Sequence, residues 1–196
     1  MLIIRHRINT ADALAQVPPD QGVEVDLRCD GGELVLRHDA VGDGERFADW
    51  LAGYRHALLI ANVKEEGLEE LVLAALAERG VTDFFFLDQS VPFLVKTTAR
   101  GEKRCAVRVS EYESTQLATK LAGKAKWIWL DCFREGGAIS AVDAGLLKAF
   151  GYRICVVSPE LHRADRQGEV AGHARWARSI GAHAVCTKLP ELWDPS

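Results

Sequence analysis

The chain has 196 residues, of which 48% are hydrophobic and 27% charged, and its formal net charge is −4. These proportions are typical of a globular protein and exclude a disordered or low-complexity chain. The longest apolar run, at 71–77, is far shorter than the ~20 residues of a membrane span. The sequence contains no stripe of basic residues of the kind that binds nucleic acid. We therefore expect one domain over residues 1–196, with no membrane span and no nucleic-acid partner.

The N-terminus and the cysteines indicate a cytoplasmic protein. The chain reaches Arg5 after a very short apolar run, which is unlike a secretory signal. Its five cysteines show no CxxC spacing, so we expect reduced, buried thiols rather than a zinc or disulfide framework. Only Cys132, beside Asp131, stands where a nucleophile is conceivable.

Short β-rich runs alternate with helical patterns along the chain. The predicted strands are at 2–6, 23–28, 34–38, 58–64, 83–88, 104–110, 127–132, 153–158 and 184–188. The predicted helices are at 10–16, 45–54, 66–79, 91–98, 113–122, 142–150 and 169–180. This order predicts parallel strands covered by helices.

One strand pair breaks the alternation. Residues 23–28 and 34–38 are separated only by a segment containing Asp30-Gly31-Gly32, which is turn chemistry and predicts an antiparallel hairpin. The eight other strands predict a compact (β/α)8 TIM barrel with a hairpin after its second strand. An average of ~24 residues per βα unit leaves room for short strands, helices and loops. A doubly wound sheet is disfavoured because no GxGxxG occurs.

The second predicted strand carries polar residues on alternate positions. Val23, Val25 and Leu27 suit packing against helices, which leaves Glu24, Asp26 and Arg28 on the other face. Two buried carboxylates on one strand face repel each other unless a cation lies between them. We therefore expect a divalent metal ion, Mg²⁺ or Ca²⁺, at this position. An edge strand with a solvated outer face is the alternative interpretation.

Most of the other predicted strands begin with apolar residues and end with polar ones. This distribution is typical of barrels whose active sites lie at the carboxyl ends of the strands. The polar residues expected at this rim are His6, Arg7, His38, Asn62, Lys64, Arg108, Asp131 and Lys188, together with Arg28. Two histidines can divide proton removal and proton donation between them, because imidazole titrates near neutrality. This chemistry predicts His6 and His38 as an acid–base pair, and Arg7 and Lys64 as phosphate-binding cations.

These residues form a pattern that resembles the glycerophosphodiester phosphodiesterases, within the phospholipase-C-like phosphodiesterase superfamily. The matching motifs are His6-Arg7, Glu24-Val25-Asp26, the Asp-Gly turn, His38-Asp39 and, in place of a third-strand E-[IV]-K, Asn62-Val63-Lys64. The segment 184–190, near the end of the sequence, also resembles the family's last strand and the proline that follows it. The resemblance implies a metal-dependent hydrolase with His6 and His38 as acid and base. It also implies that Glu24 and Asp26, with Asn62 at the third ligand position, hold the metal, and that Lys64 contacts the phosphate.

Three departures separate the chain from this family. Asn62 stands where the family carries a metal-binding Glu, which should weaken the site. The family's small insertion after the HD motif is missing, and Ile8 replaces the Gly that follows HR. In the family that insertion helps to shape the glycerol pocket, so its absence argues against a glycerol-type substrate.

Three functions therefore stay open. The first is a metal-dependent hydrolase acting on a glycerophosphodiester-like or other small phosphodiester. The second is a catalytically impaired barrel that binds a phosphorylated ligand, favoured by Asn62. The third is a metal-independent phospholipase in which Arg28 or Arg108 replaces the cation, although Glu24 and Asp26 oppose it. The sequence predicts neither the alcohol groups of the diester nor the oligomeric state.

Overall fold

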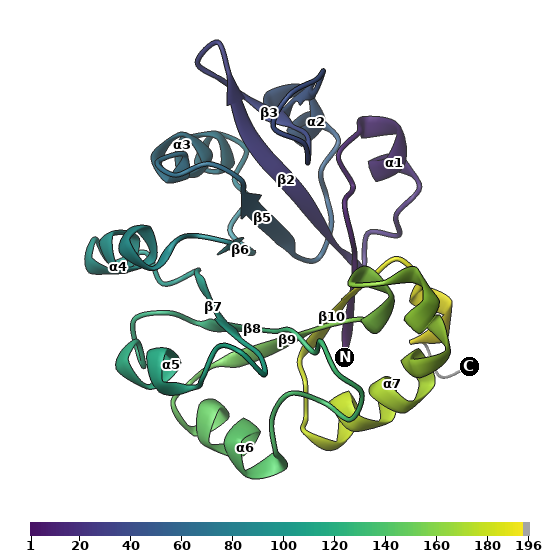
Figure 1. Ribbon diagram of the computed structural model, residues 1–196. Coiled ribbons are helices and arrows are strands. Elements are labelled where there is room, and N and C mark those ends of the chain that lie inside the picture. The colour runs from purple at the N-terminus through teal and green to yellow at the C-terminus, as the bar shows by residue number, and fades with distance from the viewer. Residues whose placement is uncertain (194–196) are drawn as a thin grey trace. The chain divides into compact units, whose positions relative to one another are not determined.

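The computed structural model describes residues 1–193 of the chain (Figure 1). Its backbone contacts divide it into two compact units. The first consists of Arg5–Arg100, and the second of Met1–Ile4 with the chain from Gly101 onward. No helix within 1–193 is both long enough and apolar enough to cross a membrane.

The Arg5–Arg100 unit is built on a mixed sheet in the order β4-β3-β2-β5-β6. Strands β2, β5 and β6 are parallel, whereas β3 and β4 are added antiparallel to the edge of β2. Its strands are β2 (Gly22–Asp30), β3 (Glu33–Leu36), β4 (Glu45–Arg46), β5 (Leu59–Val63) and β6 (Phe84–Leu87). Its helices are α1 (Ala11–Ala15), α2 (Phe47–Ala52), α3 (Glu69–Glu78) and α4 (Val91–Ala99).

The predicted hairpin is confirmed, with a tighter turn than expected. Strand β2 continues to Asp30 and β3 begins at Glu33, so only Gly31 and Gly32 form the loop. Both glycines have positive φ, at 56° and 90°, as a two-residue hairpin turn requires.

Alternation along β2 separates the core of this unit from its polar face. Val23, Val25 and Leu27 are fully buried, and they belong to an apolar core that also contains Phe47 and Trp50, stacked 5.9 Å apart. The intervening Glu24 and Asp26 project to the opposite side of the strand. Because β2 pairs with β5 so that Asp26 lies opposite Asn62, this polar face continues onto the next strand.

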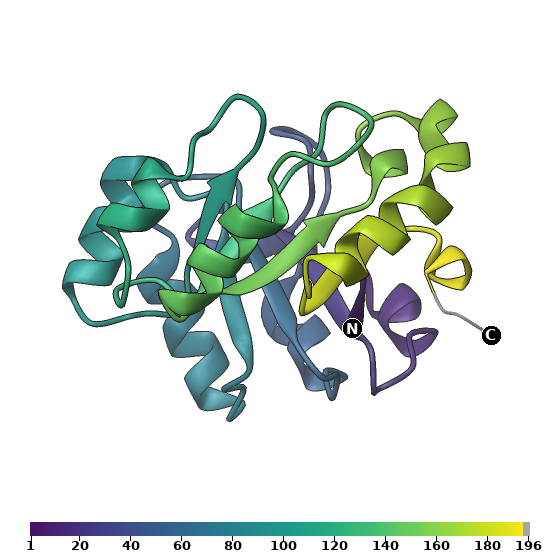
Figure 2. The same ribbon diagram turned by 90° about the horizontal axis from the view of Figure 1, so that it is seen from below.

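The second unit has its own sheet in the order β1-β10-β9-β8-β7, in which β7, β8, β9 and β10 pair in parallel. Its strands are β1 (Leu2–Arg5, of which residues 2–4 belong here), β7 (Ala106–Val109), β8 (Trp127–Leu130), β9 (Arg153–Val157) and β10 (Ala184–Thr187). Its helices are α5 (Gln116–Lys120), α6 (Ala141–Ala149) and α7 (Val170–Ser179), with 3₁₀ turns at Pro159–Leu161, Ala164–Glu169 and Pro190–Leu192. Figure 2 shows α6 running alongside β9. Ser140 and Asp143 form a capping box at the start of α6.

The predicted alternation of strands and helices is therefore confirmed as a mixed α/β fold, with two local corrections. The predicted helix at 45–54 begins with β4, because residues 45–46 pair with β3 before the helix starts at Phe47. The predicted helix at 113–122 is shorter. Hydrogen bonds from Ser110 N to Glu113 O and from Glu113 N to Ser110 Oγ hold Glu113 in a turn, and the helix starts at Gln116.

Candidate active site

A sharp bend after β1 brings His6 and Arg7 to the polar face of β2. Arg7 has a φ of 59°, which is uncommon for a residue with a side chain and costs about 1–3 kcal/mol of backbone strain. The bend lets the Arg7 amide donate to Glu24 Oε2 at 2.8 Å and the Ile8 amide donate to Glu24 O at 2.8 Å. In this geometry His6 Nε2 lies 3.8 Å from Glu24 Oε2.

Amide side chains hold the two carboxylates of β2. Glu24 and Asp26 are each 1% exposed. Asn62 Nδ2 donates to Glu24 Oε1 at 2.8 Å. Asn9 Nδ2 donates to Asp26 Oδ2 and its Oδ1 accepts from the Asp26 amide, both at 2.9 Å. These hydrogen bonds fix the orientation of both carboxylates.

Two cations lie against Asp26. Arg7 Nε is 3.4 Å from Asp26 Oδ2, and Lys64 Nζ is 3.1 Å from Asp26 Oδ1. Lys64 Nζ also lies 3.4 Å from Asp88 Oδ2, at the end of β6, so it bridges two carboxylates. Asp88 has a φ of 63°, a second strained position in this unit.

The close pairing of carboxylates has an electrostatic consequence. Burial, and after it the nearby Asp26 carboxylate, raises the pKa of Glu24 above its ordinary value. Hydrogen bonds from Asn62 and from the Arg7 amide oppose this rise, as does the positive charge of Lys64. A further cation between the two carboxylates would favour their ionised forms.

The donor set fits a hard divalent cation. A carboxylate only accepts hydrogen bonds, so Asn62 must present its NH₂ to Glu24, and this leaves its Oδ1 buried without a hydrogen-bond partner. Glu24, Asp26 and Asn62 thus offer oxygen atoms of the kind that Mg²⁺ and Ca²⁺ prefer. Within residues 1–193, no group of three or more His, Cys, Asp or Glu side chains is arranged to hold a metal ion. The site accordingly has two carboxylates rather than three.

His38 lies in the loop after β3 rather than at the end of that strand, which stops at Leu36. Its Nδ1 is 2.9 Å from Asp39 Oδ1, and this hydrogen bond lowers the pKa of Asp39. The Arg28 guanidinium donates to the His38 carbonyl oxygen at 3.0 Å and 3.2 Å, and also to Glu65 Oε1 at 3.2 Å. Arg28 therefore ties the His38 loop to β2 and to the loop after β5.

The remaining predicted rim residues lie in the second unit. Arg108 pairs with Asp131, which is 2% exposed, and His162 Nε2 lies 3.3 Å from Asp131 Oδ1. The Lys188 backbone amide donates to Glu160 Oε1 at 3.1 Å. Burial raises the pKa of Cys132 to about 12, so this residue is a thiol at neutral pH and is a poor nucleophile.

The structure thus groups six predicted residues, namely His6, Arg7, Glu24, Asp26, Asn62 and Lys64, and places Arg28 and His38 in the same unit. Sequence reasoning missed two contributors, Asn9 and Asp88. Two features of the sequence could have indicated them. Asn9 directly follows the His6-Arg7-Ile8 segment, and Asp88 is a polar residue that directly follows an apolar strand.

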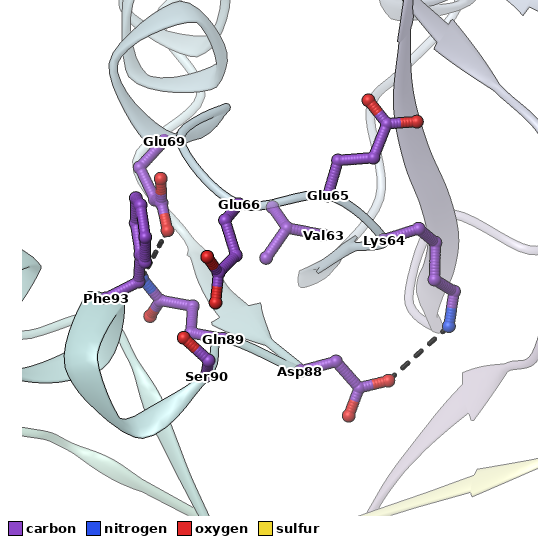
Figure 3. A pocket seen from close by; sticks show the side chains of 9 residues that line it. All are labelled: Val63, Lys64, Glu65, Glu66, Glu69, Asp88, Gln89, Ser90 and Phe93. Carbon is purple, nitrogen blue, oxygen red and sulfur yellow. Dashed lines mark hydrogen bonds and ion pairs between the residues drawn. The ribbon is translucent and has the colours of Figure 1, made fainter.

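A cavity of about 220 Å³ adjoins this group, and Lys64 and Asp88 belong to its lining (Figure 3). It lies between the loop that follows β5, the start of α3, the loop that follows β6 and the first turn of α4. The structure therefore offers an open pocket next to the carboxylates and cations.

Comparisons with known proteins identify the fold. No protein-family model matches the chain, and no curated protein matches its sequence. A glycerophosphodiester phosphodiesterase from Agrobacterium tumefaciens has a similar structure, with a TM-score of 0.67 and 15% identity over 98% of this chain and 99% of the other. A glycerophosphoryl diester phosphodiesterase from Parabacteroides distasonis gives a TM-score of 0.65 and 12% identity over 100% of this chain and 88% of the other. The chain has the fold of these two proteins.

Proposed function

We propose that the protein is a phosphoric diester hydrolase acting on a glycerophosphodiester-like or other small phosphodiester. The observation that carries this proposal is the grouping of His6, Arg7 and Lys64 around the buried carboxylates of β2. The likeness in fold to two phosphodiesterases supports it. Proteins of one fold have many different activities, so the proposed activity rests on this group of residues.

The proposed reaction needs a base and an acid on opposite sides of the phosphorus atom. One of His6 and His38 removes a proton from the attacking water as its oxygen bonds to phosphorus, and the other donates a proton to the alkoxide that leaves as the other P–O bond breaks. Lys64 and Arg7 bind the phosphoryl oxygens, Lys64 as a point charge and Arg7 through its planar guanidinium. Arg28 keeps the His38 loop in place through the His38 carbonyl.

We also propose that Glu24, Asp26 and Asn62 hold Mg²⁺ or Ca²⁺. The bound cation would neutralise charge on the phosphoryl oxygens as the transition state forms. The orphaned Oδ1 of Asn62 supports this assignment. With an amide instead of a third carboxylate, the site should bind metal less tightly than a three-carboxylate site.

The proposal extends to the arrangement of the strands. Within the two units, β2, β5 and β6 pair in parallel, as do β7, β8, β9 and β10, and the likeness in fold covers 99% and 88% of the two similar proteins. We propose that the strands form one (β/α)8 barrel domain, in which Arg108, Asp131 and Lys188 are additional rim residues. The five cysteines are free, which agrees with a cytoplasmic enzyme.

Hydrolysis of a panel of diesters tests the proposal. Purified protein is incubated with glycerophosphodiesters and with bis(p-nitrophenyl) phosphate, in Mg²⁺, in Ca²⁺ and in chelator. We expect turnover that depends on a divalent cation. Undiminished turnover in chelator would contradict the metal assignment and favour the metal-independent alternative.

A second candidate function is binding of a phosphorylated ligand without efficient turnover. Asn62 favours it, because the donor set lacks one carboxylate. This candidate predicts that calorimetry detects a phosphate ester bound to the protein while no metal supports hydrolysis. It also predicts that Asn62→Glu restores metal affinity. Efficient turnover by the unmodified protein would rule it out.

A further inference from the structure

A second cavity, of about 180 Å³, lies within the second unit, between the loop after β8 and the first half of α7 (Figure 1). Its lining consists of Glu135, Gly136, Glu169, Gly172, His173 and Trp176. The proposed hydrolase function uses none of these residues. The cavity is therefore a candidate binding site in its own right.

His173 has one buried nitrogen atom that lacks a partner. The side chain is 6% exposed and donates a hydrogen bond to the Val157 carbonyl oxygen, at the end of β9. Its Nε2 is buried and has no hydrogen-bond partner among residues 1–193, so the donor to Val157 is Nδ1. In this tautomer Nε2 carries a lone pair and only accepts. Because a buried acceptor is unfavourable when unpaired, His173 calls for a hydrogen-bond donor from a ligand.

The surroundings of His173 keep it in this neutral form. Burial, and after it the positive charge of Arg166, lowers the pKa of His173 to about 4. Arg166 is itself held by Glu169, which accepts from its Nε at 3.0 Å and from its Nη2 at 2.7 Å. At neutral pH the imidazole therefore presents a lone pair rather than a second N–H.

The other polar side chains of the lining are acceptors too. Glu135 is exposed and pairs with no cation in the part of the chain that the structure describes. Each oxygen of the Glu169 carboxylate can accept more than the hydrogen bonds from Arg166. Arg175, whose guanidinium lies near Gly172, is not part of the lining. The lining thus offers two carboxylates and one imidazole, and no donor side chain beyond the Trp176 indole.

An aromatic ring and two glycines complete the cavity. The Trp176 ring centroid lies 4.8 Å from that of His173, and the face of an indole ring attracts a cation. A Cβ at Gly136 would meet no atom within 4 Å, and one at Gly172 would meet only Arg175 Nη2, at 3.9 Å. The absence of side chains at these two positions therefore leaves space beside His173 and Trp176.

We propose that this cavity binds a small compound with a primary ammonium group. The three N–H groups of such a ligand match the three acceptors, His173 Nε2 and the carboxylates of Glu135 and Glu169. Its charge is stabilised by the carboxylates and by the Trp176 ring. The volume of about 180 Å³ is below the ~300–1,000 Å³ of pockets for drug-sized ligands, which limits the ligand to a few heavy atoms. The inference is independent of the proposed hydrolase function.

An NMR titration at neutral pH tests the proposal on protein with ¹⁵N-labelled histidines. The His173 signals are identified by their loss in His173→Gln. We expect n-butylammonium chloride to shift the Nε2 signal of His173 saturably, because a hydrogen bond then reaches this nitrogen. Tetramethylammonium chloride, which has the same charge and no N–H, should leave the signal in place. An unchanged signal with n-butylammonium, or equal shifts with both salts, would overturn the proposal.

Gly172→Leu fills the cavity from a helical position that has room for a side chain. Gly145→Leu is the matched control, since Gly145 lies within α6, is outside the lining and also has room for a Cβ. Both variants should fold, because leucine favours a helix more than glycine does. Gly172→Leu should abolish the shift, whereas Gly145→Leu should bind n-butylammonium with the Kd of the unmodified protein. Equal shifts in the two variants would place the ligand elsewhere and overturn the site.

Glu135→Gln tests the charge of the ligand. The Kd for n-butylammonium should rise by up to about fivefold, the contribution of one exposed ion pair. Glu191→Gln removes the same charge from an exposed position outside the lining, and its Kd should equal that of the unmodified protein. An equal rise in both variants, or no rise in Glu135→Gln, would overturn the assignment of the ammonium group to this carboxylate.

Discussion

Asn62→Asp tests the electrostatics of the carboxylate group, because it changes one atom type at nearly constant shape. Asn62 Nδ2 donates to Glu24 Oε1 at 2.8 Å in a fully buried position. Losing a hydrogen bond to a charged group costs about 1.5–3 kcal/mol. A third carboxylate at this position also repels Glu24, by about 4 kcal/mol for unit charges 4 Å apart at an effective dielectric of 20. Protonation of one of the carboxyl groups limits this repulsion, so we expect a total loss of about 4 kcal/mol.

Urea denaturation at neutral pH, in chelator and in excess Mg²⁺, measures this effect. Asn62→Ala separates the two contributions, because it loses the hydrogen bond without adding a charge. We expect it to lose about 2 kcal/mol in chelator. Mg²⁺ at a hundred times its Kd should return about 3 kcal/mol to Asn62→Asp. If Asn62→Asp were as stable as the unmodified protein in chelator, that result would exclude a destabilising repulsion between buried carboxylates at this position. If Mg²⁺ did not stabilise it, the metal assignment would be contradicted.

Three further variants test other parts of the structure. Lys64→Met should lower kcat/KM for a diester by about 10- to 100-fold, since it removes a charged contact to the phosphate, and an unchanged value would exclude that contact. Phe47→Ala should lower the free energy of unfolding by about 3–5 kcal/mol, because the ring is fully buried against Trp50; a loss below 1 kcal/mol would contradict this packing. Burial lowers the pKa of His173 from 6.5 to about 4, so the unfolded chain takes up a proton before the folded one does. Stability should therefore fall by about 3 kcal/mol as pH drops from 6.5 to 4, as measured by urea denaturation, and His173→Gln should reduce this loss; an unchanged pH profile in that variant would refute the assignment.

The order of the elements could be predicted from the sequence because it depends on local chemistry. Turn residues such as Gly31 and Gly32 and the alternation of Glu24 and Asp26 with Val23 and Val25 carry their own structural preferences. The ends of elements could not be predicted as well. Strand β4 forms only because Arg46 lies opposite Val35 in the folded sheet, a contact between residues distant in sequence.

The candidate site was predictable where a motif occupies one strand, and less so where partners come from several segments. Glu24, Asp26 and the residues at the end of β5 follow from strand alternation and register. By contrast, Asn9 is bound to Asp26 only because of the bend at Arg7, and Arg28 turns away to hold His38 and Glu65. These orientations depend on tertiary contacts that no spacing rule describes.

The most direct test of the central claim is the rate of hydrolysis of bis(p-nitrophenyl) phosphate by the unmodified protein, His6→Ala and His38→Ala in the presence of Mg²⁺ or Ca²⁺. We expect measurable turnover by the unmodified protein and a loss of at least about 100-fold in each variant, with unchanged circular dichroism. Turnover that survives unchanged in both variants would contradict the assignment of His6 and His38 as the acid–base pair.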